Sequence, residues 1–159
     1  MKKLFLAAFA VFAFASVNAQ EFKVGLNAGI PVGDADTAYS FNIQLDVAAL
    51  WEVSDAFDAG VTAGYSNTSL KSEYKDFGDS AGFIPIAATG RYAVSDDFTL
   101  GADLGYALGV NEGNDGGFYY RPRASYSVSE PLDVVLAFSN VSADGFTFSA
   151  LTLGVEYGF

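Results

Sequence analysis

The sequence predicts an all-β protein, an eight-stranded antiparallel up-and-down transmembrane β-barrel. Three observations predict this fold. Apolar and polar residues alternate with a period of two in eight stretches, short turns and longer polar loops connect these stretches in alternation, and no charged residue lies on the apolar face. A sheet with one entirely apolar face fits a closed wall that meets lipid outside and keeps its polar side chains inside.

The N-terminal segment reads as one that is removed on export. Two lysines precede an apolar run from Leu4 to Ala15, and small residues lead to Ala19, which is the pattern of a cleavable secretory signal. The run is too short for a helical membrane span, which needs about 20 apolar residues. We therefore expect a signal peptide over residues 1–19 and an exported outer-membrane β-barrel domain over residues 20–159.

Composition excludes several classes of function. After removal of the signal, the chain has 6 basic and 19 acidic residues and therefore a formal charge of −13. This charge argues against nucleic acid as a partner. The chain has no histidine and no cysteine, so it lacks Ser-His and Cys-His nucleophiles and the usual imidazole and thiolate metal ligands. We expect no enzyme activity, no catalytic residue, no metal site and no cofactor.

Eight stretches alternate clearly enough to be predicted as strands. The clearest runs from Phe98 to Val110, where every second residue is apolar and the residues between are Thr, Gly, Asp or Ala. Strands of about ten residues suit a tilted transmembrane barrel wall. The expected strands cover residues 22–30, 39–53, 57–66, 83–94, 98–110, 118–128, 132–139 and 151–159.

The connections between these stretches alternate in length. Residues that favour reverse turns form short connections at 54–55, 95–97 and 129–131, and longer polar loops lie near 31–38, 67–82, 111–117 and 140–145. Outer-membrane barrels place short turns in the periplasm and long loops outside, so an even strand count puts both termini in the periplasm. Pro85 and Pro122 each delete a donor from the pairing ladder, and we expect both at the outer rim.

Charged side chains on the polar face are expected to meet in the lumen. Most other residues of this face are Gly, Ala, Ser or Thr, which leaves room for a few long side chains inside an eight-stranded barrel. Because unpaired buried charges are costly, we expect a lumenal ion-pair network that plugs the barrel. Its members are Lys23, Asp46, Glu52, Asp58, Arg91, Asp103, Arg121, Arg123 and Glu156.

Aromatic residues gather on the apolar face near the short-turn end. Aromatic rings suit the headgroup layer of a membrane, so this placement predicts an interfacial girdle. Its members are Phe22, Trp51, Phe57, Tyr92, Phe98 and Tyr126, joined by Tyr157 and Phe159.

The signal, the eight alternating strands and the C-terminal stretch Leu151–Phe159 resemble the small outer-membrane β-barrel family that includes the OmpX and OmpA transmembrane domains. The N-terminal start and the cleavage region resemble members from the Bacteroidetes. The resemblance implies that the terminal alternating residues are an assembly signal read by the barrel-assembly machinery, although facing lipid would explain the same pattern. These residues are Leu151, Leu153, Val155, Tyr157 and Phe159.

Three functions remain open from the sequence. The first is a non-enzymatic integral membrane protein with a filled lumen that supports the envelope or presents its loops, above all residues 67–82 with Tyr74 and Phe77, for surface contacts. The second is a narrow pore, although water-filled channels need about 16 strands. The third is a soluble lipocalin-like lipid binder with its apolar face inward.

We expect a monomer in contact with outer-membrane lipid and lipopolysaccharide. The acidic stretch 111–117 is more simply a hydrated loop than a calcium site, because it lacks the EF-hand spacing.

Overall fold

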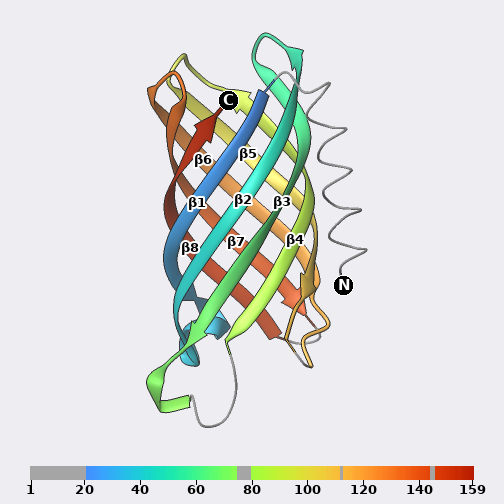
Figure 1. Ribbon diagram of the computed structural model, residues 1–159, viewed down its shortest axis with the longest axis vertical. Coiled ribbons are helices and arrows are strands. Elements are labelled where there is room, and N and C mark those ends of the chain that lie inside the picture. The colour runs from blue at the N-terminus through green and yellow to red at the C-terminus, as the bar shows by residue number, and fades with distance from the viewer. Residues whose placement is uncertain (1–20, 75–79, 112, 144–145) are drawn as a thin grey trace.

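The computed structural model describes residues 21–74, 80–111, 113–143 and 146–159, so the expected signal peptide lies outside the described residues. Eight antiparallel strands close into one barrel in chain order, which confirms the predicted fold class (Figure 1). Two 3-10 turns, η1 (Gly33–Thr37) and η2 (Ser72–Tyr74), lie in the connections. The strands are β1 (Glu21–Val32), β2 (Tyr39–Ser54), β3 (Phe57–Leu70), β4 (Ala81–Ala93), β5 (Phe98–Gly109), β6 (Gly117–Ser129), β7 (Leu132–Ala143) and β8 (Phe146–Gly158).

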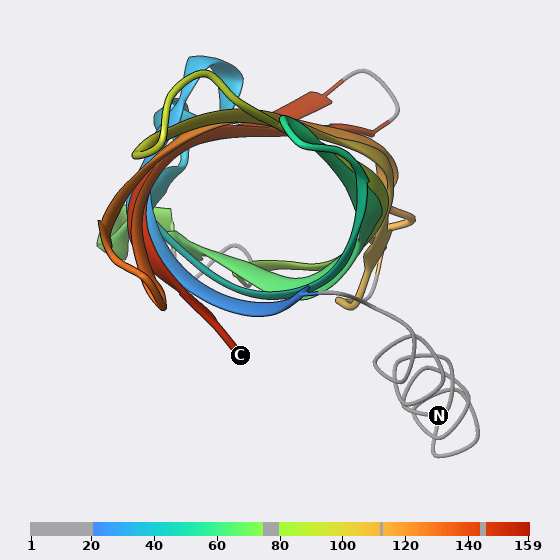
Figure 2. The ribbon, with the colours of Figure 1, turned by 90° about the horizontal axis from the view of Figure 1, so that it is seen from above.

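The first and last strands form the seam that closes the barrel. β1 pairs with β8 from Lys23 opposite Gly158 to Val32 opposite Ser149, so no edge strand is left over (Figure 2). At the end of the seam, the backbone N–H of Phe159 donates to the carbonyl of Phe22 at 2.9 Å. A closed ring satisfies backbone groups that hydrocarbon could not.

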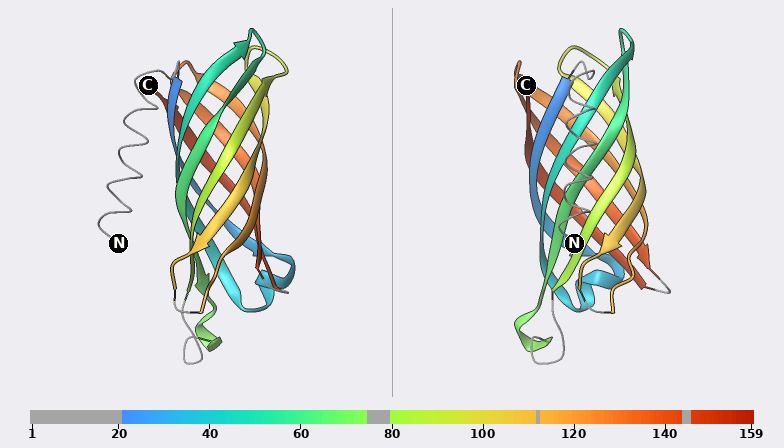
Figure 3. Two further views of the ribbon diagram at one scale, coloured as in Figure 1. Left: turned by 90° about the vertical axis from the view of Figure 1, so that its right-hand side faces the viewer. Right: turned by 45° about the vertical axis from the view of Figure 1, so that its right-hand side comes forward.

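Short and long connections separate to opposite ends of the barrel. Residues 55–56, 94–97 and 130–131 connect strands at the end that also holds the start of β1 and the end of β8, here called the turn end (Figure 3). β1, β3 and β5 end, and β2, β4 and β6 begin, at the other end, here called the loop end.

Two of the expected loops are too long. β3 continues to Leu70, and β7 and β8 continue to within two residues of each other, leaving residues 144–145, which are outside the described part. The polar composition misled the prediction because these polar residues pair as strand residues. Asn140 is opposite Ser149 and donates from Nδ2 to the Ser149 Oγ at 2.7 Å.

Pro85 and Pro122 lie inside β4 and β6, so the expectation of a rim position for these two prolines is wrong. Pro85 is opposite Ala107 and Pro122 is opposite Ala102, and these ladders on the β5 side are continuous. On the opposite side, the β3–β4 ladder has a gap next to Pro85 and the β6–β7 ladder has a gap next to Pro122. The missing N–H is accommodated by interrupting one ladder rather than by moving the proline to the rim.

The two faces of the wall differ sharply. Large apolar side chains point outward along every strand, and Leu104 and Leu153 near mid-wall are 57% and 60% exposed. The charged residues of the strands take the inward positions, where Arg121 is only 1% exposed. This is the reverse of a lipocalin-like barrel, whose apolar face would point inward. Among the described residues, no helix has the length and apolar character to cross a membrane.

Candidate functional site

The lumen holds the densest set of buried charges among the described residues. Three arginines and three carboxylates meet there, so their formal charges balance. All six come from inward positions of β2, β4, β5, β6 and β8, and each is at most 5% exposed. We call this set the charged network. Its members are Asp46, Arg91, Asp103, Arg121, Arg123 and Glu156.

Glu156 is the acceptor that joins two arginines toward the turn end. Arg123 donates to both of its carboxylate oxygens, from Nη1 to Oε2 at 2.9 Å and from Nη2 to Oε1 at 2.7 Å. Arg91 donates to the same Oε1 at 3.4 Å and, from Nε, to the Thr89 Oγ1 at 3.0 Å. Two-point pairing of a guanidinium with a carboxylate fixes geometry as well as charge.

Arg121 holds the other part of the charged network near the middle of the barrel. Its Nη1 lies 3.0 Å from Asp46 Oδ1 and 3.7 Å from Asp103 Oδ2. Asn27 donates from Nδ2 to the same Asp46 oxygen at 3.0 Å. Asp103 also lies 3.9 Å from Arg91, so it joins the two parts of the network through charge rather than through short hydrogen bonds.

Small residues next to the arginines make room for them. A Cβ added at Gly101 would lie 2.8 Å from the Arg91 Cδ and 3.2 Å from the Arg123 Cγ. A Cβ at Gly25 would lie 2.6 Å from the Asp46 Oδ2. An eight-stranded barrel is only wide enough for side chains to fill it, so long charged residues require glycine beside them.

Lys23 forms a separate ion pair at the turn end. Its Nζ lies 2.8 Å from Asp133 Oδ2 and 3.2 Å from Glu21 Oε1, and Ser127 donates to the other Asp133 oxygen at 2.6 Å. The ion pair of Lys23 with Asp133 therefore links β1 to β7, which lies on the other side of β8. The predicted set did not include Asp133, although its inward position in the alternation could have identified it.

Glu52 and Asp58 lie at the turn end of the β2–β3 ladder. They are opposite each other in the β2–β3 ladder, close to the turn at residues 55–56, and Glu52 is exposed. Asp58 is also opposite Arg91 in the β3–β4 ladder. Their inward positions follow the alternation, but the strand ends carry them to the rim.

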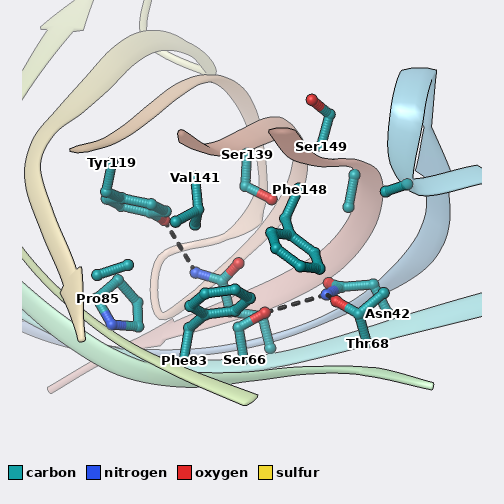
Figure 4. A pocket seen from close by; sticks show the side chains of 14 residues that line it. Asn42, Ser66, Thr68, Phe83, Pro85, Tyr119, Ser139, Val141, Phe148 and Ser149 are labelled. Carbon is teal, nitrogen blue, oxygen red and sulfur yellow. Dashed lines mark hydrogen bonds between the residues drawn. The ribbon is translucent and has the colours of Figure 1, made fainter. Parts of the chain in front are cut away.

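Above the charged network, toward the loop end, the lumen is polar without charge. Gln44 donates from Nε2 to the Tyr119 hydroxyl at 3.1 Å. Asn42 donates to the Ser66 Oγ at 3.0 Å and to the Thr68 Oγ1 at 2.8 Å (Figure 4). We call these five side chains the uncharged layer. The narrow cavity that they help to line has room for about one water molecule.

An aromatic cluster lies at the loop end of the lumen. Phe148 lies at its centre, with its ring centroid 5.0 Å from Phe83, 5.5 Å from Tyr39 and 4.8 Å from Phe146. We call these four residues the aromatic cluster. Figure 4 shows the pair of Phe83 and Phe148. Phe83 is 2% exposed, and Ala35 of η1 is fully buried beside the same cavity. The sequence reading missed this cluster, although Phe83 and Phe148 interrupt the polar face at inward positions.

The predicted girdle residues point outward at the turn end. Cross-strand neighbours link them, since Phe57 is opposite Tyr92 and Phe98 is opposite Tyr126. At the seam, the ring centroids of Phe22 and Phe159 are 6.3 Å apart, and those of Tyr157 and Phe159 are 4.9 Å apart. Trp51 lies beside the turn at residues 55–56.

A second set of outward aromatics, absent from the predicted girdle, lies toward the loop end. Tyr65, Tyr106 and Phe118 are each about half exposed. Each is eight residues from a turn-end aromatic of its own strand: Tyr65 from Phe57, Tyr106 from Phe98, and Phe118 from Tyr126. Eight residues span roughly 27 Å along a strand, which becomes roughly 20 Å of height at the usual tilt. Two aromatic belts at that separation bound an apolar band of membrane dimensions.

The acidic stretch at the loop end is internally bonded. The Asn111 Oδ1 accepts from the backbone N–H of Gly82 at 2.5 Å, and the Asn114 Oδ1 accepts from that of Gly116 at 3.1 Å. The Asn114 Nδ2 donates to the Gly82 carbonyl at 3.0 Å. The Asn111 oxygen and the Asn114 nitrogen therefore hold the β5–β6 loop against β4, and the Asn114 oxygen is engaged within the loop.

A closed barrel with an apolar exterior, two outward aromatic belts and a charged interior defines an integral β-barrel membrane protein. The chain belongs to the outer membrane protein beta-barrel domain family, whose model matches residues 4–159. The resemblance to small outer-membrane barrels is thereby confirmed. No curated protein matches this chain by sequence.

Solved structures share the fold at low sequence identity. Ail of Yersinia pestis in a phospholipid bilayer nanodisc has a TM-score of 0.62 at 12% identity, covering 87% of this chain and 99% of Ail. A de novo designed transmembrane β-barrel has a TM-score of 0.60 at 16% identity, covering 89% and 98%. The N-terminal barrel domain of Pseudomonas aeruginosa OprF has a TM-score of 0.55 at 10% identity, covering 89% and 98%. At these identities, the likeness shows the fold alone.

Proposed function

We propose that this protein is a non-enzymatic integral outer-membrane barrel with a closed lumen, which supports the envelope and offers its loop end for surface contacts. The charge-balanced network of three arginines and three carboxylates carries the proposal. Filling the narrow lumen with paired side chains leaves no continuous aqueous path, whereas open porins use about 16 strands.

Recording from the purified protein in planar lipid bilayers tests the closed lumen. We expect no stable, discrete conductance at neutral pH. Stable unitary steps from the unmodified protein would favour the alternative, a narrow pore for small solutes. Heat-modifiable gel migration of the same preparation serves as the control that the inserted protein is a closed barrel.

The loop end is suited to partners other than polyanions. Its described part carries more negative than positive charge: the acidic residues are Asp34, Asp36, Glu73 and Asp115, and the single basic residue is Lys71. Ail has been solved in complex with the heparin analogue sucrose octasulfate, but an acidic loop end would repel such a ligand. Heparin-agarose retention at low salt would contradict this part of the proposal.

Orientation and lipid contacts follow from the same barrel. We propose that a cleaved signal exports the chain, that the turn end with both termini faces the periplasm, and that the protein is a monomer surrounded by lipid and lipopolysaccharide. The two aromatic belts support this placement. Protease treatment of intact cells should cut the loop at residues 71–80 and leave the turn at residues 94–97 uncut.

The last strand is proposed to carry the assembly signal. Leu151, Leu153, Val155 and Tyr157 all point outward along β8, and Phe159 continues their row at the seam. An outward row on the closing strand is accessible to assembly machinery before β8 pairs with β1. Substitution of Phe159, described below, tests this role separately from the role of lipid contact.

A further inference from the structure

The aromatic cluster blocks the lumen by a different chemistry from that of the charged network. Its rings pack edge to face around Phe148, with Phe83 almost fully buried. Val141 of β7 and Ala107 of β5, on the strands adjacent to those of Phe148 and Phe83, belong to the same buried apolar group. Apolar constrictions of this kind exclude ions and polar solutes because water does not fill them.

The two obstacles are separated along the barrel axis. On β4, Phe83 precedes Arg91 by eight residues, and on β8, Phe148 precedes Glu156 by the same number. Eight strand residues at the usual tilt correspond to roughly 20 Å along the axis. The aromatic cluster and the turn-end part of the charged network therefore lie near opposite ends of the lumen.

Gln44 and Tyr119 of the uncharged layer lie between them, whereas Ser66 is opposite Phe83 in the β3–β4 ladder. Gln44 and Asp46 are consecutive inward residues of β2, and Tyr119 and Arg121 are consecutive inward residues of β6. On β2 and β6, the inward side chains thus change from charged to uncharged between one inward position and the next. The small cavity lined by Gln44 and Tyr119 also touches Phe83 and Phe148, so the uncharged layer adjoins the aromatic cluster (Figure 4).

We propose that the lumen is closed twice in series, by the charged network toward the turn end and by the aromatic cluster at the loop end. Opening either closure alone leaves the other intact, so a solute crosses only when both are opened. The inference rests on the proposed closed lumen and adds that the charged network is not the only barrier.

Conductance of four proteins in planar bilayers tests this proposal: the unmodified chain, a network variant, a cluster variant and their combination. The network variant is Arg123→Ser with Glu156→Ser, which removes one positive and one negative charge together from the turn-end part of the charged network. The cluster variant is Phe83→Ala with Phe148→Ala, and Phe83→Leu with Phe148→Leu is its matched control. Heat-modifiable migration confirms that each protein is a closed barrel.

We expect discrete conductance from the combined variant only, at least tenfold more frequent than in the other three. Conductance from the network variant alone would overturn the aromatic closure while leaving the closed lumen of the native protein intact. Conductance from the cluster variant alone would overturn the network as a closure. A combined variant that stays silent would overturn both closures as the controlling barriers. Conductance from the unmodified chain would instead overturn the proposed function.

A thiol probe tests the aromatic closure without altering the charged network. The chain has no cysteine, and Ala87 points into the lumen midway between Phe83 and Arg91 on β4. We expect Ala87→Cys to react slowly with a small charged thiol reagent added from the loop end of proteoliposomes. Combining Ala87→Cys with the two alanine substitutions of the cluster variant should raise the reaction rate at least tenfold. Combining it with the two leucine substitutions of the matched control should not. Equal rates in all three proteins would overturn the aromatic closure.

Discussion

Arg123 and Glu156 form a two-point ion pair inside the barrel, with each carboxylate oxygen accepting one guanidinium hydrogen bond at 2.9 Å or less. Both residues are almost fully buried, so neither charge can be satisfied by bulk water. The pair is therefore sensitive to the loss of either partner but tolerant of the loss of both, because a buried ion pair contributes little net stability over an apolar replacement.

Arg123→Leu should lower the free energy of unfolding by about 3–5 kcal/mol, because it leaves the Glu156 charge with a weaker partner. The double variant with Glu156→Leu should lie much closer to the native value, since Arg91 still has Asp103. Urea unfolding in lipid vesicles, followed by the fluorescence of the single tryptophan, Trp51, measures both. Equal stability of the single variant and the native protein would contradict the structural role of the pair.

Gly101→Val should destabilise the barrel by about 1–3 kcal/mol, because the new side chain overpacks the space between Arg91 and Arg123. The matched control is Ala102→Val, one residue along β5, whose side chain points outward and is exposed. The same unfolding assay compares them. The interpretation fails if the two valine variants lose the same stability.

Leu104→Arg should impair folding into bilayers because it puts a charge on the outward face at the middle of β5. A cation at the bilayer midplane of a barrel costs about 2–4 kcal/mol, and near the interface about 0–1 kcal/mol. Val110→Arg, at the loop end beyond the same strand, is the matched control. Folding yield in phospholipid vesicles should fall for the first variant alone, and a similar loss for both would argue against the membrane position given by the aromatic belts.

Phe159→Ala should reduce the amount of folded barrel in cells more than Phe22→Ala does. Both changes remove the ring contact between Phe22 and Phe159, and Phe159→Ala also removes the contact with Tyr157, but only Phe159 ends the proposed assembly signal. Refolding of the purified variants in detergent should be alike, because no assembly machinery is present. If the two variants assemble equally in cells, Phe159 acts through lipid and packing alone.

The alternation of residue types was sufficient to assign the faces of the wall. It places Arg91, Arg121 and Arg123 inside because a period of two leaves no other position for them in a strand whose other face is apolar. It could not select their partners. Partners across the lumen depend on strand tilt and stagger, which bring Glu156 of β8 to Arg91 of β4 although these strands are not adjacent.

Local composition was less reliable near the loop end. Polar residues such as Asn67 and Thr68 favour loops, but here they continue β3 and pair with both neighbouring strands. The aromatic cluster was missed because Phe83 and Phe148 lie at inward positions that the rule of a polar lumen assigns to polar residues. The packing of the rings around Phe148 depends on which strands meet at the loop end, and the sequence pattern alone does not give this.

The gaps in pairing beside Pro85 and Pro122 divide the wall into two curved panels. One panel contains β4, β5 and β6, and the other runs from β7 through the seam to β3. The ladders within each panel have no comparable gap in mid-strand. Amide hydrogen exchange should therefore be fastest at the residues that flank the two gaps.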